Sequence, residues 1–322
     1  MERIVQLIEE DLNKLEGAIE ELLTTKIPFI KEVVYHIVKS GGKRIRPVLL
    51  IHSARMCAAD GDKHIPYAAI VEFIHTATLL HDDVVDNAET RRGSRTANEI
   101  WGNEPSVLVG DFLFSKSFDL MIENNNAKIL RIMAKVTTGL AEGEILELLK
   151  TSDIGTTQEE YFEVISKKTA VLLSAACEIG AVLGRVDARK RAALRKYGYN
   201  VGMAFQLTDD ILDYVSDDTV LGKHAGTDLK EGKVTLPLIQ ALKSATEKER
   251  NQVRKTLDGQ HVTARDFEKV RSIIQKYGGI EYTLEISRKY VEDAKQSLKP
   301  FPSSPHRDAL LDFADYIITR KT

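Results

Sequence analysis

The chain has 322 residues, of which 43% are hydrophobic and 29% are charged, the balance of a folded globular protein rather than a disordered one. Its formal net charge of −3 argues against a nucleic-acid binder, which would present a large basic surface. No apolar run approaches the ~20 residues that span a bilayer, and the acidic, amphipathic N-terminus differs from a signal peptide. We therefore expect a cytoplasmic protein with no transmembrane segment, in which Cys57 and Cys177 are buried thiols.

Apolar residues recur at helical spacing in almost every segment, whereas the alternation typical of β-strands is not sustained anywhere. Gly and Pro fall mainly between the helical stretches. No internal repeat or composition change marks a domain boundary, so the sequence predicts an all-α protein with a single domain over residues 1–322. The longest patterns predict helices over residues 66–87, 127–150, 158–184 and 187–215.

Two acidic motifs lie in otherwise apolar helices. They contain three aspartates each, namely Asp82, Asp83 and Asp86 in HDDVVD (the first motif) and Asp209, Asp210 and Asp213 in QLTDDILDY (the second motif). The outer pair of each motif is spaced i, i+4, which places both carboxylates on one helix face about 6 Å apart. Like charges at that spacing repel one another, so each motif needs compensating solvent or cations.

A single motif of this kind would also suit a solvated acidic turn. Two of them, both embedded in apolar helices, favour a site for hard cations, and Mg²⁺ bound by carboxylates and substrate phosphates fits best. His75 lies seven residues before Asp82, and Gln206 lies seven residues before Asp213. Both side chains are therefore expected on the same helix faces as the carboxylates.

Basic residues stand where a phosphate group could meet them. Lys43 and Arg46 in GGKRIRP are expected in the first turn of a helix, where the helix dipole disfavours cations unless an anion is bound. Arg91 and Arg92 directly follow the first motif, and guanidinium groups bind phosphate oxygens in pairs. Each of these residues alone would also suit a solvated surface.

Further candidates follow along the chain. Lys168 and Thr169 lie within the third long helix. Lys223 and Lys233 lie in the Gly-rich segment LGKHAGTDLKEGKVTLP, which is poorly suited to a long helix and which we expect to close over a ligand. Taken singly, each lysine is also compatible with a solvated charge.

Together these motifs resemble the trans-isoprenyl diphosphate synthase family. GGKRIRP, HDDVVD…RRG, the Lys-Thr pair, FQLTDDILDY and GKHAGTDLKEGKVTLP occur in the family's order from about residue 30 to 240. The chain is most similar to bacterial long-chain members, which implies a homodimer of all-α subunits of the isoprenoid synthase type, each with a central cavity. The implied reaction is the repeated condensation of isopentenyl diphosphate onto an allylic primer such as farnesyl diphosphate, ending at octaprenyl diphosphate for quinone side chains.

The resemblance also implies a role for each candidate residue. Mg²⁺ is expected on Asp82, Asp86 and Asp209, with Asp83, Asp210 and Asp213 in support; the allylic diphosphate on Arg91, Lys168, Lys223 and Lys233; isopentenyl diphosphate on Lys43, Arg46, His75 and Arg92; and Thr169 and Gln206 at the reacting centre. Product length is expected to depend on Ala77, where a small residue lets a long chain pass, and on Met121 and Met133 as a deeper floor, although methionines at helical spacing are usually ordinary core.

Other readings stay open at this point: a shorter- or longer-chain synthase of C15–C50 product, a class I terpene cyclase, a non-catalytic synthase subunit, or a Mg²⁺ phosphohydrolase. A cyclase needs no second diphosphate site, which would leave Lys43, Arg46 and Arg92 unexplained. Glu147 stands where relatives commonly carry Gln. The terminal Arg320-Lys321 is expected to be a solvated tail, unless it closes over substrate.

Overall fold

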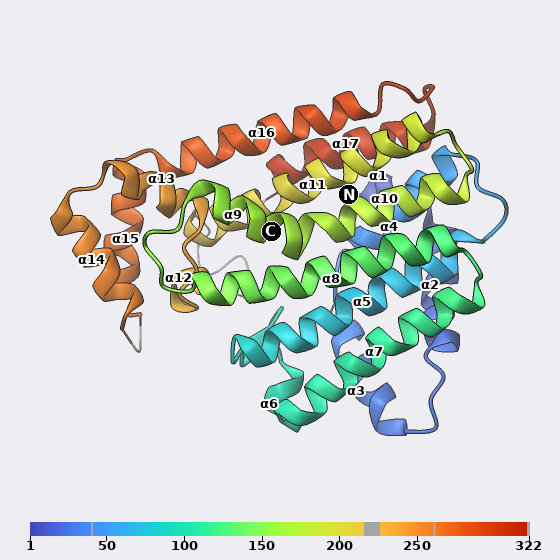
Figure 1. Ribbon diagram of the computed structural model, residues 1–322, viewed down its shortest axis with the longest axis horizontal. Coiled ribbons are helices and arrows are strands. Elements are labelled where there is room, and N and C mark those ends of the chain that lie inside the picture. The colour runs from blue at the N-terminus through green and yellow to red at the C-terminus, as the bar shows by residue number, and fades with distance from the viewer. Residues whose placement is uncertain (40, 216–225, 260–261, 321–322) are drawn as a thin grey trace. The chain divides into compact units, whose positions relative to one another are not determined.

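The computed structural model is almost entirely helical, which confirms the predicted all-α class (Figure 1). It describes every residue except 40, 216–225, 260–261 and 321–322. Within this described part, no helix combines the length and apolar character needed to cross a membrane. The first elements are α1 Glu2–Gln6, α2 Glu9–Leu22, α3 Pro28–Lys39, α4 Ile45–Met56, α5 His64–Val85, β1 Thr90–Arg91, β2 Ser94–Arg95, α6 Ala97–Trp101 and α7 Asn103–Glu123.

The later elements include the three longest helices expected after residue 125. They are α8 Ala127–Lys150, α9 Gln158–Ile165, the π-helical segment η1 Ser166–Ala170, α10 Val171–Leu183, α11 Ala188–Val215, α12 Thr227–Lys230, α13 Leu236–Ser244, α14 Glu247–Leu257, α15 Ala264–Lys276, α16 Gly279–Ser297 and α17 Pro305–Thr319. The predicted helix over 158–184 is thus interrupted by one π-helical segment, a feature that often occurs at functional sites.

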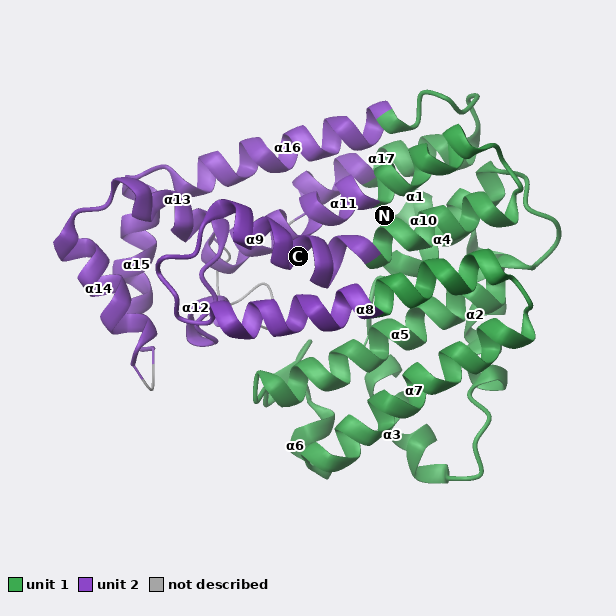
Figure 2. Ribbon diagram, viewed as in Figure 1, with its two compact units in different colours: residues 1–137, 172–198, 297–313 green, residues 138–171, 199–296, 314–322 purple. Residues whose placement is uncertain are grey.

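Two compact units divide the chain (Figure 2). The boundaries between them fall within α8, α10, α11, α16 and α17, so these helices contribute residues to both units. The single domain over 1–322 stays a prediction. Unit 1 comprises residues 1–137, 172–198 and 297–313, and unit 2 comprises residues 138–171, 199–296 and 314–322.

In unit 1, α5 is the central helix, and α2, α4 and α7 pack against it. Most of its side chains are buried because its sequence is apolar nearly all round. A Cβ atom on Gly180 would lie 2.6 Å from the backbone nitrogen of Ala54, so glycine permits the close approach of α10 to α4. Cys57 and Cys177 are buried free thiols, as predicted. Burial raises the pKa of each thiol to about 12.

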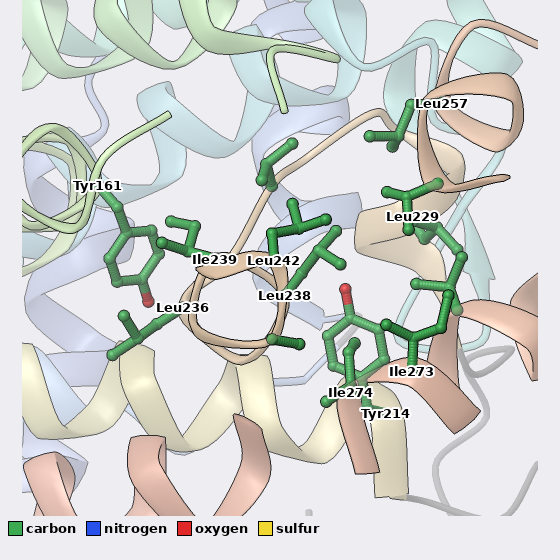
Figure 3. Packing of buried hydrophobic residues seen from close by; sticks show 14 of the residues in the cluster. Tyr161, Tyr214, Leu229, Leu236, Leu238, Ile239, Leu242, Leu257, Ile273 and Ile274 are labelled. Carbon is green, nitrogen blue, oxygen red and sulfur yellow. The ribbon is translucent and has the colours of Figure 1, made fainter. Parts of the chain in front are cut away.

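In unit 2, a buried apolar cluster holds α9, α11, α13, α14 and α15 together. Figure 3 shows Tyr161 and Tyr214 beside the aliphatic side chains of α13, including Leu236 and Leu238. Each large side chain buried in this way stabilises the fold by about 1.5–3 kcal/mol. The cluster therefore fixes the end of α11, which carries the second motif.

A short antiparallel hairpin, β1–β2, follows the first motif and was not predicted from the sequence. Its two-residue loop is Arg92-Gly93, and both residues have a positive φ, of 53° and 77°. Turns with two such residues match the twist of paired strands. The left-handed backbone of Arg92 is unfavourable for a non-glycine residue, and such conformations cluster at functional sites.

Candidate active site

The first motif lies in the last turn of α5, where Asp86 is the C-terminal cap. Asp83 is buried, and the Nε of Arg91 donates to its Oδ1 at 2.6 Å. Burial raises the pKa of Asp83, and the adjacent Arg91 guanidinium opposes this shift. Asp82 and Asp86 are half-buried. The hairpin thus supplies one positive charge to the buried carboxylate of the motif.

The first predicted anion-binding group lies at the N-terminus of α4. Arg46 is in the first turn, as expected, but Lys43 precedes the helix because Arg44 is its N-terminal cap with a φ of 47°. Arg44 itself is structural, since its Nη1 donates to Glu72 at 2.7 Å and its Nε to Glu16 at 3.0 Å. A helix N-terminus with nearby cations suits a phosphate group.

His75 lies on α5, two turns before the first motif. Burial lowers its pKa well below the ordinary value, and the positive charges of Arg46 and Arg92 lower it further, followed by those of Arg91 and Arg44. The imidazole is therefore neutral at physiological pH and is able to donate one hydrogen bond to an anion without adding charge.

Arg92 packs against the glycine pair that precedes α4. Its Nη1 donates to the carbonyl oxygen of Gly41, and a Cβ atom on Gly42 would lie 2.7 Å from the same nitrogen. A side chain at position 42 would therefore require the end of the Arg92 side chain to move. Partial burial and the charge of Arg91 lower the pKa of Arg92, which is the response of a cation crowded by other cations. We call Lys43, Arg46, His75, Arg91 and Arg92 the basic cluster.

The second motif lies near the end of α11, and its middle carboxylate, Asp210, is buried. Tyr161 donates its hydroxyl to Asp210, and Gln206 Nε2 donates to Asp210 Oδ1 at 2.9 Å. Thr169 donates to Gln206 Oε1 at 2.8 Å, so the predicted Thr169 and Gln206 lie together. Burial raises the pKa of Asp210 to about 7, against the lowering effect of its two hydrogen bonds.

Asp213, the last aspartate of this motif, stabilises the start of α12. Its two carboxylate oxygens accept the backbone N–H groups of Thr227 and Asp228, at 3.0 and 3.2 Å. Burial and the charges of Asp213 and Asp210 raise the pKa of Asp228 well above its ordinary value. Asp213 therefore stabilises the backbone at the start of α12.

Two of the three lysines expected at the allylic diphosphate approach one carboxylate. Lys168, in the π-helical segment, pairs with Glu147 and also with Glu144 at 2.9 Å. Lys233 pairs with Glu231 at 2.6 Å and lies 3.9 Å from Glu147. Glu147 thus bridges both ammonium groups. Lys223 lies outside the described residues.

A cavity of about 100 Å³ in unit 2 gathers many of these side chains. Its walls combine apolar residues with both signs of charge. The lining residues are Glu147, Lys150, Thr151, Thr156, Tyr161, Val164, Ile165, Lys168, Thr169, Gln206, Asp210, Asp228, Lys233, Val234 and Thr235.

Both acidic motifs suit a hard cation. Each stands near a helix C-terminus, where the backbone adds partial negative charge, and each offers carboxylate oxygens without thiols.

Among the described residues, one group brings three ligand atoms within 4.8 Å of one another, and it is a different one: Asp11, Asp62 and His64. There Arg55 already pairs with Asp11 and lies 3.5 Å from Asp62, so that group is an ion-pair network.

The three residues predicted to control product length lie in the protein interior, and so does Arg320, which was expected to be solvated. Ala77, Met121 and Met133 are all buried in unit 1. Arg320 was expected to be a solvated tail, but its side chain is buried and its Nη2 donates to Asp209 Oδ1 at 2.6 Å. The expectation was wrong because the chain end docks on an α11 carboxylate. Lys321 lies outside the described residues.

Sequence reasoning missed several residues that hold the site in place. Tyr161 gave no signal, since an isolated tyrosine in a helix resembles ordinary core. Asp228 lies within the quoted segment GTDLKEGK, but its burial could not be read from it. Glu144 was missed for a similar reason, because its partner Lys168 is 24 positions away.

Comparison with known proteins decides the family. Residues 27–275 match the sequence profile of the family described as Polyprenyl synthetase. The chain belongs to the polyprenyl synthetase family. It is 39% identical to octaprenyl diphosphate synthase of Escherichia coli (strain K12) over 323 residues, covering 99% of each chain. It is 38% identical to all-trans-nonaprenyl-diphosphate synthase (geranyl-diphosphate specific) of Rhodobacter capsulatus, covering 98% of this chain and 97% of the relative.

A solved polyprenyl synthase from Caulobacter crescentus CB15, complexed with calcium and isoprenyl diphosphate, superposes with a TM-score of 0.95 at 43% identity, covering 100% of this chain and 98% of that one. The predicted family, the isoprenoid synthase-like fold and the enzyme class are confirmed: this polyprenyl synthetase family member is a prenyltransferase of isoprenoid biosynthesis. The terpene cyclase, phosphohydrolase and non-catalytic readings are therefore set aside.

Proposed function

We propose that this prenyltransferase lengthens an allylic diphosphate, such as farnesyl diphosphate, by successive addition of isopentenyl diphosphate and ends at octaprenyl diphosphate. The observation that carries the proposal is the basic cluster, built around a neutral His75 and the N-terminus of α4. Apart from Arg91, which pairs with Asp83, these groups form a second anion-binding set distinct from the acidic motifs. An enzyme that only ionises one diphosphate would have no use for it.

The residue roles follow from the charges. Isopentenyl diphosphate is bound by the basic cluster through Lys43, Arg46, His75 and Arg92. Arg91, Lys168 and Lys233, with Lys223, bind the allylic diphosphate. Asp82, Asp86 and Asp209 hold Mg²⁺, which when bound supplies further positive charge against the departing diphosphate. Asp83, Asp210 and Asp213 are proposed to support these ligands by holding Arg91, Gln206 and the start of α12 beside the motifs.

The chemistry begins when the allylic carbon–oxygen bond breaks and its electron pair leaves with the diphosphate. Arg91, Lys168 and Lys233 stabilise that developing charge, because their carboxylate partners already hold them in place. Thr169 and Gln206 present fixed dipoles near the reacting carbons. The double bond of isopentenyl diphosphate attacks the allylic cation, a new carbon–carbon bond forms, and loss of one proton restores an alkene. The departing diphosphate is the proposed proton acceptor.

Product length is proposed to depend on α5. Ala77 lies five residues before Asp82, which is about 7.5 Å along the helix, and its small side chain leaves room for a growing chain. Met121 and Met133 are proposed as the deeper floor. Octaprenyl is the specific proposal because the octaprenyl synthase of Escherichia coli is 39% identical, although the nonaprenyl enzyme is nearly as similar.

A homodimer is the proposed assembly, and the proposed location is the cytoplasm, with the lipid product passed to a membrane. Ile145, Leu148 and Leu149 form an i, i+3, i+4 set on α8 and remain exposed by 59%, 60% and 70%. A continuous apolar stripe of this kind marks a protein-binding surface. Sedimentation velocity is expected to give the mass of two chains, and a single-chain mass would contradict the proposal.

The test of the reaction is incubation of the purified protein with Mg²⁺, farnesyl diphosphate and labelled isopentenyl diphosphate. The products are dephosphorylated and separated by chain length. A ladder that ends in one dominant C40 alcohol supports the proposal. A different dominant length would correct the product while keeping the reaction, and no incorporated label would contradict elongation itself.

A further inference from the structure

Arg320, the last residue before the undescribed chain end, sits in a socket made by α11. Its side chain is only 4% exposed. Its Nη2 donates to Asp209 Oδ1 at 2.6 Å and to the carbonyl oxygen of Phe205 at 2.9 Å, and the guanidinium carbon lies 3.9 Å from the centre of the Phe205 ring. A carboxylate, a carbonyl and an aromatic face together match the three ways in which a guanidinium binds.

The socket contains a residue with a proposed chemical role. Asp209 is the first aspartate of the second motif and a proposed Mg²⁺ ligand, so the inference rests on the proposed function. Arg320 binds one of its oxygens, Oδ1, while the carboxylate keeps 41% exposure. The guanidinium therefore restrains the carboxylate without enclosing it.

We propose that Arg320 is a positioning residue for the metal ligand Asp209. A carboxylate on a helix rotates about two side-chain bonds, and each rotation lost on metal binding weakens the affinity. A hydrogen bond to one oxygen fixes the rotation beforehand and directs the other oxygen toward the cation. Partners that orient metal ligands in this way typically change metal affinity by 10–100-fold.

Arg320 directly follows helix α17. α17 ends at Thr319, and the backbone N–H of Arg320 still donates to the carbonyl oxygen of Tyr316 at 3.0 Å. The Arg320 side chain therefore extends from the C-terminal end of α17, where Ile317 is buried. The packed end of α17 therefore helps to fix the proposed metal ligand Asp209 in α11, because the Arg320 guanidinium connects the two.

A competing effect has the opposite sign. The positive charge of Arg320 also repels a divalent cation near Asp209. If repulsion outweighed positioning, removal of the guanidinium would tighten metal binding. The sign of the change therefore separates the two effects.

The test measures Mn²⁺ binding to the full chain, with Mn²⁺ alone as the probe and the free ion counted by electron paramagnetic resonance. Arg320→Met is expected to weaken Mn²⁺ binding about tenfold. Arg320→Lys keeps the positive charge and a hydrogen-bond donor, so its Mn²⁺ binding is expected to be weakened less than that of Arg320→Met. Arg307→Met is the matched control, because Arg307 lies on α17, which Arg320 directly follows, and likewise donates to a backbone carbonyl, that of Leu298 at 3.3 Å. It is expected to bind as the wild type does.

A second readout separates positioning from general damage. With Arg320→Met, the Mg²⁺ concentration for half-maximal turnover is expected to rise about tenfold, while turnover at saturating Mg²⁺ falls less. If Arg320→Met folds poorly, Arg320→Lys takes its place in the test, provided that its melting temperature equals that of the wild type.

Unchanged or tighter Mn²⁺ binding by Arg320→Met would overturn the inference, and tighter binding would identify Arg320 as a competitor of the metal. If the wild type bound Mn²⁺ and Asp209→Ala lost it, the proposed metal site would stand whatever Arg320 does. If the wild type bound no Mn²⁺ at all, the metal site and this inference would fall together.

Discussion

The two acidic motifs share their spacing and their place near a helix end, but their buried middle carboxylates are compensated in different ways. Asp83 receives a full positive charge from Arg91. Among the described residues, Asp210 accepts hydrogen bonds from the hydroxyl of Tyr161 and the amide of Gln206, which are neutral donors. Burial raises the pKa of both carboxyls, to about 7 for Asp210, and at Asp83 the full charge of Arg91 opposes the rise.

The difference comes from the segments that follow each motif. A two-stranded hairpin after α5 carries Arg91 back to the first motif. After α11 the chain returns as the short helix α12, whose N–H groups bind Asp213. The same aspartate spacing thus yields a charge-paired site in one case and a hydrogen-bonded, proton-sensitive site in the other.

The largest expected effect is shared by both motifs. Asp82→Ala and Asp209→Ala are expected to lower turnover by roughly 10²–10³-fold or more, because each removes a ligand that helps stabilise charge on the leaving diphosphate. Incorporation of labelled isopentenyl diphosphate measures the loss, and circular dichroism melts check the fold. Asp119→Ala, an exposed carboxylate on α7, is the control. Unfolding of either motif variant would instead assign that carboxylate a structural role.

The middle aspartates are expected to differ in stability. Asp83→Asn strands the guanidinium of Arg91, whose side chain is 26% exposed, and is expected to cost about 2–3 kcal/mol in the free energy of unfolding. Asp210→Asn keeps hydrogen-bonding partners and removes a desolvated charge, so its cost is expected to stay below about 1 kcal/mol. Urea unfolding of the metal-free protein at pH 7 measures both. Equal losses would erase the distinction between the motifs.

Acid–base linkage sharpens the same distinction. A carboxyl group whose pKa is raised by folding binds its proton more tightly in the folded state, so its contribution to stability is complete below its ordinary value of 3.8 and is lost as pH rises through about 7. Between these two pH values, the proton on Asp210 changes the free energy of unfolding by about 1.4 kcal/mol per pH unit. Asp210→Asn is expected to remove this slope from metal-free unfolding curves, and an unaltered slope would contradict it.

The smallest change concerns the product rather than the rate. Ala77 and Ala204 are both buried and both stand five residues before the first aspartate of a motif. Ala77→Phe is expected to shorten the product by at least one isoprene unit, because the ring blocks the tail path. Ala204→Phe, the matched change in α11, is expected to leave product length unchanged. Chromatography of the dephosphorylated products compares them, and an unchanged ladder for Ala77→Phe would remove Ala77 from the path.

Local periodicity predicted much of this molecule. The helices expected over 127–150 and 187–215 are observed as α8 and α11 within one residue at each end, because long apolar stripes are strong signals. Both motifs and the buried cysteines were also found from residue types and spacing, whereas the placing of Thr169 with Gln206 came from the family resemblance. The contacts of Tyr161, Glu144 and Arg320 were not, because each joins segments distant in sequence and a single sequence holds no record of such pairs.

The π-helical segment Ser166–Ala170 has a consequence for protein engineering. A π turn accommodates one more residue than an α turn, so the segment behaves as a one-residue insertion within a continuous helix. Removing a single residue there would convert the π turn into a regular α turn, which redirects the side chains within the turn while the flanking helices keep their faces. Lys168 and Thr169 would then face away from Glu147 and Gln206. Designers who transplant or align this helix must keep its length, residue for residue, even where composition is free to vary.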